Sequence, residues 1–224
     1  MLGSLAAFRG TNTEYLSSLS KDVVRMSRRA KSVVLREGEL ADGLYVVLRG
    51  RVHLARSLPG GREIILGSLG PGQLFGETVV IEHLVMTSSA ITSLPSEIAR
   101  IPADALTAFT VAHPESLRGL MGSLAARMSD VESVASDLAL CDVESRLRRL
   151  LVQLARRQGR PAIEAGEGWV LAPVPTQSEL ARMVGSCRET VSRTLTSMTK
   201  AGDLIARGRR LTVRPQLMAR FPVA

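Results

Sequence analysis

The chain contains few of the residues that form disulfides, bind metals or stack on nucleobases. Its 224 residues include two cysteines, three histidines and only 3% aromatic side chains. The cysteines, Cys141 and Cys187, lie 46 positions apart, which excludes a disulfide framework and a zinc cluster and indicates reduced thiols. The sequence contains no run of about 18 apolar residues, so we expect no membrane span. The first ten residues lack the basic segment of a secretory signal. A cytoplasmic protein is therefore expected.

Positive charge is concentrated in the C-terminal part of the chain. The whole sequence carries 29 Lys and Arg against 21 Asp and Glu. Residues 1–142 hold 14 of these basic and 15 of these acidic residues, a net charge of −1, so residues 143–224 carry +9. An asymmetry this sharp is typical of a phosphate-binding surface. The chain is long enough for two domains of about 100 residues each, and we expect the second to bind nucleic acid.

The first half of the chain, up to Ile101, contains short apolar runs separated by glycine-containing turns. The runs are Ser32–Leu35, Leu44–Leu48, Val52–Ala55, Glu63–Leu66 and Ala90–Thr92. Strands this short, with a turn about every ten residues, favour a small antiparallel barrel or sandwich.

Residues 115–140 have the periodicity of a long helix. Apolar side chains recur at alternating spacings of four and three residues, as in a heptad repeat. This heptad row consists of Leu117, Met121, Leu124, Met128, Val131, Ala135 and Leu138. A helix that packs on its own domain shows a broader apolar stripe. The narrow row therefore predicts a two-stranded coiled coil and a homodimer.

A further helix is expected to begin at Asp142, where we place the start of the C-terminal domain. The Asp142 carboxylate suits an N-cap, and Glu144 suits the positive end of a helix. Arginines then alternate with leucines, which predicts an amphipathic helix to about Gly159.

The strongest local pattern, from Thr176 to Arg193, predicts a helix-turn-helix. Two capping boxes, Thr176-x-x-Glu179 and Ser186-x-x-Glu189, are each expected to start a helix. Gly185 supplies the tight turn, and the second helix is expected over roughly residues 187–199. Ala181 is small, as expected where two helices approach closely, and the expected core-facing side chains are Leu180, Val184, Val191 and Leu195.

Two sets of side chains in this region are expected to contact DNA. The base-reading set on the second helix is Arg188, Glu189, Ser192 and Arg193, because arginine suits guanine and glutamate suits the cytosine amino group. The phosphate-contacting set is Thr176, Gln177, Ser186, Arg207 and Arg209. The two last arginines belong to a predicted β-hairpin, the wing, at residues 203–213. Phosphate contacts position a protein on DNA without specifying its sequence.

Several motifs together point to one known family. They are Gly43-Leu44-Tyr45-Val46-Val47-Leu48-x-Gly50, Pro71–Glu77, the heptad helix, Asp142, and Gly185-x-x-Arg188-Glu189-Thr190-Val191-x-Arg193. On these motifs the chain resembles the Crp/Fnr regulators, which are related to the cyclic AMP receptor protein and the fumarate–nitrate regulator. The resemblance implies an α+β protein with a cyclic-nucleotide-binding-type antiparallel β-roll in residues 1–114, a long dimerisation helix in 115–141 and a winged helix-turn-helix in 142–224. It also implies a homodimer on palindromic DNA with TGTGA-like half-sites, and RNA polymerase as a partner.

The resemblance also implies an effector pocket, in which part of the family's pattern is missing. The pocket positions are Gly76, Glu77, Ser88, Ser89, Val131 and Glu132. Ser88 stands where cyclic AMP-binding relatives carry an arginine that pairs with the cyclic phosphate. Val131 and Glu132 replace the Thr and Ser that read adenine. Loss of a charge-assisted phosphate contact costs roughly 1.5–3 kcal/mol. We therefore expect a degenerate pocket and a regulator that is effector-independent or answers to another small molecule.

Other interpretations stay open at this point. One is a cyclic-nucleotide-responsive activator; another is a metal- or haem-dependent sensor or cupin-like enzyme, although His53, His83 and His113 are scattered singly. An iron–sulfur sensor would need a cysteine cluster, and an RNA reader usually carries more aromatic residues. The helix-turn-helix could also be purely structural. Lone cysteines such as Cys141 and Cys187 usually act as small buried hydrophobic residues. Taken together, the cysteines and histidines lead us to expect no cofactor, no metal and no catalytic residue.

Overall fold

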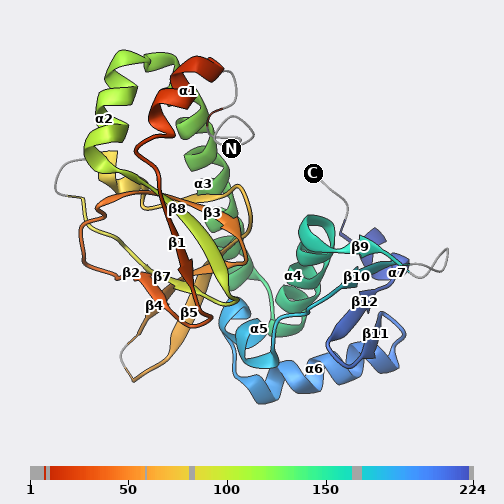
Figure 1. The fold of residues 1–224 in the computed structure, drawn as a ribbon. Coiled ribbons are helices and arrows are strands. Elements are labelled where there is room, and N and C mark those ends of the chain that lie inside the picture. The colour runs from red at the N-terminus through yellow and green to blue at the C-terminus, as the bar shows by residue number, and fades with distance from the viewer. Residues whose placement is uncertain (1–7, 9–10, 59, 81–83, 163–167, 222–224) are drawn as a thin grey trace. The chain divides into compact units, whose positions relative to one another are not determined.

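The structure is a computed structural model of one chain and describes residues 8, 11–58, 60–80, 84–162 and 168–221. The chain divides into two compact units, Met1–Glu132 and Ser133–Ala224. The first contains two β-sheets with helices, and the second is a largely helical domain with a small sheet (Figure 1). The long helix α3 (Leu117–Leu140) contributes its last turns to the second unit. Within the described residues, every helix is too short or too polar to cross a membrane.

Two four-stranded antiparallel sheets form the frame of the first unit. One sheet has the order β1 (Val24–Arg28), β8 (Ser96–Pro102), β3 (Gly43–Arg49) and β6 (Leu74–Phe75). The other has the order β2 (Val33–Leu35), β7 (Ser89–Thr92), β4 (Val52–Ser57) and β5 (Glu63–Leu69). Each of the five predicted apolar runs overlaps a strand. The predicted antiparallel β domain is confirmed.

Strand β1 lies outside the predicted runs because it is a polar edge strand. Among the described strands it pairs only with β8, and four of its five residues are exposed while Met26 is half-buried. An edge strand has a single neighbour and stays largely solvated. It therefore lacks the apolar alternation by which a strand is recognised in a sequence.

Strand β3 is buried on both faces and separates two hydrophobic clusters. Its Tyr45 and Val47 pack with residues of the second sheet. Its Leu44 and Val46 pack with Leu106 of helix α2 (Ala103–Ala112). Successive side chains of a strand point to opposite faces, so a strand between two clusters is an unbroken apolar run. Helix α1 (Thr13–Leu19) packs in the same cluster as α2.

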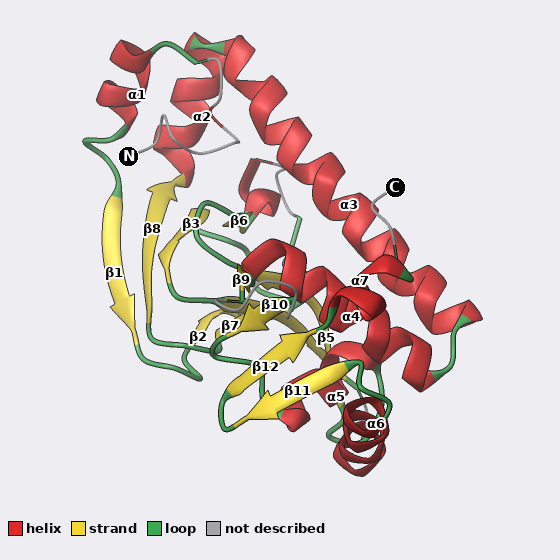
Figure 2. Cartoon of the chain, turned by 90° about the vertical axis from the view of Figure 1, so that its right-hand side faces the viewer, coloured by secondary structure: helices red, strands yellow, loops and turns green. Residues whose placement is uncertain are grey.

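Helix α3 confirms the long helix expected for residues 115–140. It begins after the short 3-10 helix η4 (Pro114–Ser116) and extends over 24 residues. Figure 2 shows it as one uninterrupted helix. Along α3, all of which is described, Leu120 alone is buried, and it is not a member of the heptad row. The chain's own core therefore does not use that row.

In the second unit, helix α4 (Val143–Gln158) follows the last turns of α3 and starts as predicted. The Ser145 N–H donates to Asp142 Oδ1 at 2.8 Å, so Asp142 is the N-cap. Leu147, Leu151 and Leu154 are buried in the core of this unit. Of the two arginines that follow Leu147, Arg149 is exposed and Arg148 is half-buried, so the amphipathic pattern is only partly realised.

A winged helix-turn-helix completes the second unit and confirms the predicted fold class. Its helices are α5 (Gln177–Val184) and α6 (Arg188–Lys200), and its wing is the hairpin β11 (Leu204–Arg207) and β12 (Arg210–Val213). The wing joins β10 (Trp169–Leu171) and β9 (Arg160–Pro161) in a sheet of order β11-β12-β10-β9, and α7 (Pro215–Ala219) follows. Strands β9 and β10 have two and three residues, which is too short for a recognisable period.

Candidate nucleic-acid interface and effector site

Helix α5 begins and ends as the sequence predicts. The Glu179 N–H donates to Thr176 Oγ1 at 3.2 Å, and Thr176 N–H donates to Glu179 Oε2 at 2.8 Å, which completes the first capping box. Gly185 has a φ of 62°, a left-handed conformation that glycine adopts without a steric penalty. The chain can therefore turn tightly into α6.

The second predicted capping box, Ser186-x-x-Glu189, is wrong. The N-cap of α6 is Cys187, which makes no side-chain cap hydrogen bond. The Ser186 N–H instead donates to the Ala181 carbonyl oxygen at 2.9 Å and closes α5. A capping box needs that N–H for the glutamate, so the tight turn leaves no donor for Glu189. The cap position also exposes Cys187, which contradicts the expectation of a buried thiol; Cys141 is half-buried.

The thiol at the start of α6 affects the neighbouring carboxylate. The Glu189 carboxylate accepts hydrogen bonds from the Glu189 backbone N–H and from the Cys187 thiol, and both lower the pKa of Glu189. Hydrogen bonds from the Thr190 hydroxyl and backbone N–H lower the pKa of Cys187. Glu189 is therefore ionised at neutral pH and able to accept hydrogen bonds.

The structure places the predicted base-reading residues together on α6. Arg188, Glu189 and Arg193 are exposed and Ser192 is half-buried, whereas Val191 belongs to the buried core. Arg193 Nη2 lies 3.5 Å from Thr190 Oγ1, so its guanidinium lies close to the first turn. One face of α6 therefore packs and the other presents two cations and a carboxylate to solvent.

The predicted phosphate-contacting residues lie at the start of α5, in the turn and on the wing. Thr176 is exposed, and Gln177 and Ser186 are half-buried. Arg207 and Arg209 are exposed on either side of Gly208, whose φ of 60° makes the wing turn. Thr176 Oγ1 also donates to Glu179 Oε2 at 2.8 Å, so its hydroxyl is engaged within the cap.

Part of the positive charge of the second unit is used inside the fold, which the sequence analysis missed. Arg148 forms ion pairs with Glu144 at 2.7 Å and with Asp203, which is 1% exposed. Burial pushes the pKa of Asp203 upward, but hydrogen bonds from Arg148 and Gln216 outweigh it and hold the pKa below the ordinary 3.8. Arg149 pairs with Asp137 at 3.1 Å. The arginines of α6 and the wing, by contrast, face solvent.

In the first unit, the effector position Glu77 pairs with a residue that the sequence analysis missed. Glu77 lies in the 3-10 helix η3 (Glu77–Val80) and forms an ion pair with Arg127 of α3. Burial lowers the pKa of Arg127, although an arginine stays protonated. Arg127 stands one helical turn before Val131, so its position on the helix was the available signal. Gly76 precedes the pair with a φ of 78°, and an added Cβ would lie 2.9 Å from the Gly43 carbonyl oxygen.

None of the other effector positions carries a positive charge that could pair with a ligand phosphate. Ser88 is 7% exposed, and Ser89 Oγ accepts a hydrogen bond from the Glu37 N–H at 3.0 Å. Val131 and Glu132 are exposed on α3. Of the predicted effector positions, Glu77 and the adjacent Gly76 are thus the ones that the structure places beside a cation, Arg127.

The histidines do not assemble into a metal site within the described part of the chain. His53 is buried in β4, and His113 stacks on Tyr15 with ring centroids 3.7 Å apart. His83 lies outside the described residues. Among the residues that are described, no group of three or more His, Cys, Asp or Glu side chains could hold a metal ion.

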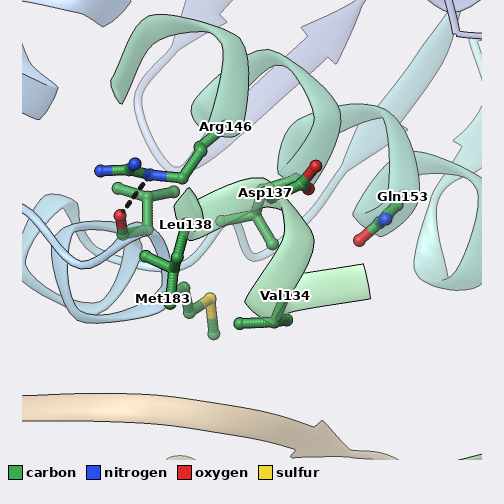
Figure 3. Close-up of a pocket in the computed structure, with 8 residues that line it drawn as sticks. Val134, Asp137, Leu138, Arg146, Gln153 and Met183 are labelled. Atoms are coloured by element: carbon green, nitrogen blue, oxygen red, sulfur yellow. Dashed lines mark hydrogen bonds between the residues drawn. The ribbon is translucent and has the colours of Figure 1, made fainter. Parts of the chain in front are cut away.

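A shallow depression in the second unit lies where α3, α4 and α5 meet. Val134 and Leu138 of α3, Leu150 of α4 and Met183 of α5 contribute apolar lining. Arg146 also lines it and extends from α4 toward α5 (Figure 3). Its Nε donates to the Val184 carbonyl oxygen at 2.9 Å.

Comparison with known proteins gives matches along both units. The cyclic nucleotide-binding domain family matches residues 25–113, and the Crp-like helix-turn-helix domain family matches residues 145–219. The chain is 30% identical, over 95% of its length and 94% of the relative's, to the CRP-like cAMP-activated global transcriptional regulator of Mycobacterium tuberculosis. It is 32% identical to the cAMP-activated global transcriptional regulator CRP of Haemophilus influenzae, over 82% of this chain and 81% of that protein.

Solved structures share the architecture. The c-di-GMP responsive global regulator CLP of Xanthomonas campestris matches with a TM-score of 0.76 and 28% identity, over 91% of this chain and 99% of that one. FixK2 of Bradyrhizobium japonicum has a similar fold, with a TM-score of 0.77 at 22% identity, over 90% of this chain and 98% of its own. The two-unit fold, the winged helix-turn-helix and these matches lead to one conclusion: the chain belongs to the Crp/Fnr family of DNA-binding transcription regulators.

Proposed function

We propose that the chain acts as a homodimer that binds palindromic DNA with TGTGA-like half-sites, and that its DNA binding does not depend on cyclic AMP. The observation that carries the proposal is the solvent face of α6, where Arg188, Glu189 and Arg193 stand over a packed core face. As a regulator in the cytoplasm, the DNA-bound dimer would act on RNA polymerase.

The apolar row on α3 supports the homodimer. All seven residues of the heptad row are exposed in the single chain, and Met121 reaches 67%. Rows of this kind are buried between the two helices of a coiled coil. A second copy of α3 would cover the row and relate two α6 helices by a two-fold axis. Helix-turn-helix dimers, the cyclic AMP receptor protein among them, enter successive major grooves about 34 Å apart.

The chemistry of α6 supports sequence reading in the major groove. An arginine can donate two hydrogen bonds to guanine O6 and N7, and an ionised glutamate accepts from the cytosine amino group. Arg188 and Arg193 supply the first kind of contact and Glu189 the second. A TGTGA half-site carries two guanines on one strand and two cytosines on the other, so it offers base partners to both arginines and to the glutamate.

The wing supports binding to the DNA backbone. Arg207 and Arg209 are exposed at the turn between β11 and β12. Cations at such a turn would neutralise phosphates and release counterions, whatever the base sequence. We expect them to position α6 rather than to select the site.

The state of the effector site supports independence from cyclic AMP. Glu77, which would accept from a ribose hydroxyl, is already paired with Arg127. The Ser89 hydroxyl already accepts from the Glu37 N–H, and Ser88 replaces the arginine that pairs with the cyclic phosphate in relatives. A ligand would have to compete with contacts the chain makes itself. Another small-molecule effector stays compatible with this arrangement.

A cyclic-nucleotide-responsive activator is the second candidate. Two curated relatives are named as cAMP-activated, and Arg127 places a cation beside Glu77. In this case the cyclic phosphate would take Arg127 away from Glu77. Micromolar binding of cyclic AMP in a calorimeter would favour this candidate over effector independence.

Selection of binding sites from a random duplex library tests the proposed function. We expect inverted repeats of TGTGA and TCACA for the wild-type protein. The preference should be lost in R188A/R193A and kept in the control R36A, which removes an exposed arginine of the first unit. Recovered sites without two-fold symmetry, or an unchanged preference in R188A/R193A, would contradict the proposal.

A further inference from the structure

We infer that Arg146 is a positioning residue that holds the recognition helix α6 at a set angle to the dimer helix α3, an inference that rests on the proposed function. The carrying observation is one guanidinium that bridges the carboxyl ends of two helices. Arg146 Nε donates to the Val184 carbonyl oxygen at 2.9 Å, and its Nη1 donates to the Cys141 carbonyl oxygen at 2.8 Å. Figure 3 shows the side chain reaching from α4 with the bond to Val184 dashed.

Both acceptors are carbonyls that a helix leaves without an internal donor. Val184 is the last residue of α5, and Cys141 follows directly after the last residue of α3. The final carbonyls of a helix need partners from outside, and a cation there also suits the helix dipole. Arg146 meets this need at two helix ends with one group.

The two carbonyls lie next to the parts of the chain that pair with the second copy and with DNA. Cys141 comes three residues after Leu138, the end of the heptad row, and Val184 comes four residues before Arg188, the start of α6. Gly185 is the left-handed residue between α5 and that start. A rotation of α5 against α3 would break one of the two hydrogen bonds, so the bridge opposes it.

The packing around Arg146 supports the same role. Leu138 of the heptad row, Leu150 of α4 and Met183 of α5 line the depression beside the guanidinium. The end of the dimer helix, the helix that carries Arg146 and the first helix of the DNA-binding motif therefore meet at this point. A guanidinium is a rigid fork of five N–H donors, so its Nε and Nη1 can donate to two carbonyls at once, whereas a lysine has a single nitrogen on a flexible stem.

Arg149, about one helical turn after Arg146 on α4, provides a matched control. Arg149 Nη1 donates to Asp137 of α3 at 3.1 Å, and its guanidinium carbon lies 5.6 Å from the ring centroid of Phe221. It therefore contacts α3 and the C-terminal segment, and neither interaction involves α5. R149Q removes the same charge from the same helix as R146Q.

The test uses duplexes with TGTGA and TCACA half-sites whose separation changes by one base pair at a time, together with a duplex that carries one half-site. Wild-type protein should prefer one separation. R146Q should bind that duplex about tenfold more weakly, with a flatter dependence on separation and unchanged binding to the single half-site. R146K, which keeps the charge, should restore only part of the dependence, and R149Q should retain it. Circular dichroism checks that each variant is folded.

The outcomes separate this inference from the proposed function. If wild-type protein prefers one separation and R146Q shows the same profile, the Arg146 inference alone is overturned. Equal flattening by R149Q, or equal weakening on every duplex including the single half-site, would overturn it too. If the wild-type protein shows no preference for paired half-sites, the proposed function falls and the inference with it.

Discussion

The effector site of the first unit and the DNA-facing surface of the second differ in where their polar groups find partners. Glu77 pairs with Arg127 and Ser89 bonds to Glu37, all within the first unit. On α6 and the wing, Arg188 and Arg209 face solvent. Groups that are already satisfied inside a chain gain little from a ligand, whereas exposed cations gain from phosphates. This difference supports the proposal that the folded chain binds DNA without a nucleotide in its effector site.

The largest expected effect comes from separating the two copies, which leaves the DNA-facing surface intact on each. L124E/V131E places two charges in the heptad row and should yield a monomer, because a coiled-coil seam does not accept buried unpaired charge. Affinity for the palindrome should fall by about 10²- to 10⁴-fold, since the two half-sites are no longer bound as one unit. Sedimentation velocity and DNA titration measure the two effects.

A matched variant separates loss of the dimer from added negative charge. V111E/L140E adds the same charge at exposed apolar positions outside the heptad row, 76% and 84% exposed. It should remain a dimer and bind the palindrome as before. If the wild-type protein sediments as a monomer at micromolar concentration, the prediction that the heptad row holds a homodimer is wrong.

The next effect concerns an arginine that serves the fold instead of DNA. D203A leaves Arg148 without its buried partner and should cost about 3–5 kcal/mol of unfolding free energy. E144A removes the exposed partner of the same arginine and should cost about 1 kcal/mol or less. Urea unfolding of both variants measures the difference. Equal costs would show that burial of Asp203 does not matter to the pair.

The lowered pKa of Asp203 predicts that its contribution to the stability of the fold depends on pH. Its pKa is lower in the folded state than the ordinary 3.8, so the folded state favours the ionised form. The resulting stabilisation is complete above the unfolded pKa and is lost as the pH falls through the folded pKa. The gap in unfolding free energy between wild type and D203A should therefore narrow below about pH 4. A gap that widens toward acid pH would have the wrong sign.

A smaller effect distinguishes base contacts from phosphate contacts within the exposed surface. R193A should cost ~1–3 kcal/mol per half-site and relax the preference at one guanine. R209A should weaken binding to all duplexes alike and lower the salt slope by about one per subunit. Titrations at several salt concentrations, on cognate and scrambled duplexes, measure both. If R209A changes the base preference, the wing reads sequence and the assignment is wrong.

The smallest effect is expected at the effector site. Cyclic AMP should change DNA affinity less than about threefold, a coupling of under roughly 0.7 kcal/mol. Calorimetry with the protein alone and a DNA titration with saturating nucleotide provide the measurement. Tight binding with a large coupling would mean that Arg127 exchanges Glu77 for the cyclic phosphate, and the contrast between the two regions would disappear.

Local patterns in the sequence were enough to predict most elements of the fold. The heptad row predicted α3, Asp142 predicted the start of α4, and Thr176 with Gly185 predicted the limits of α5. These features depend on neighbours within a few residues, such as a cap and the N–H two or three positions on. The resemblance to the Crp/Fnr family, which also rests on short motifs, was confirmed by the two family matches and by the 30% identical relative.

Local patterns failed where a group had two competing partners. Ser186 could cap α6 or use its N–H to close α5, and the turn at Gly185 selects the second. Strand β1 is held by pairing with β8, which is distant in sequence, rather than by its own alternation. A motif does not rank such alternatives, because their energies depend on which groups the fold brings within reach.

The sequence by itself therefore determined most of the elements, the family and the part of the chain in which positive charge is concentrated. Only the tertiary structure decided which charges remain exposed for DNA and which are used inside the chain. Arg127 with Glu77, Arg148 with Asp203 and Arg146 with the ends of α3 and α5 join positions 50, 55 and up to 38 residues apart. Hydrogen bonds and ion pairs act over a few ångströms, so partners this distant in sequence meet only when the chain is folded.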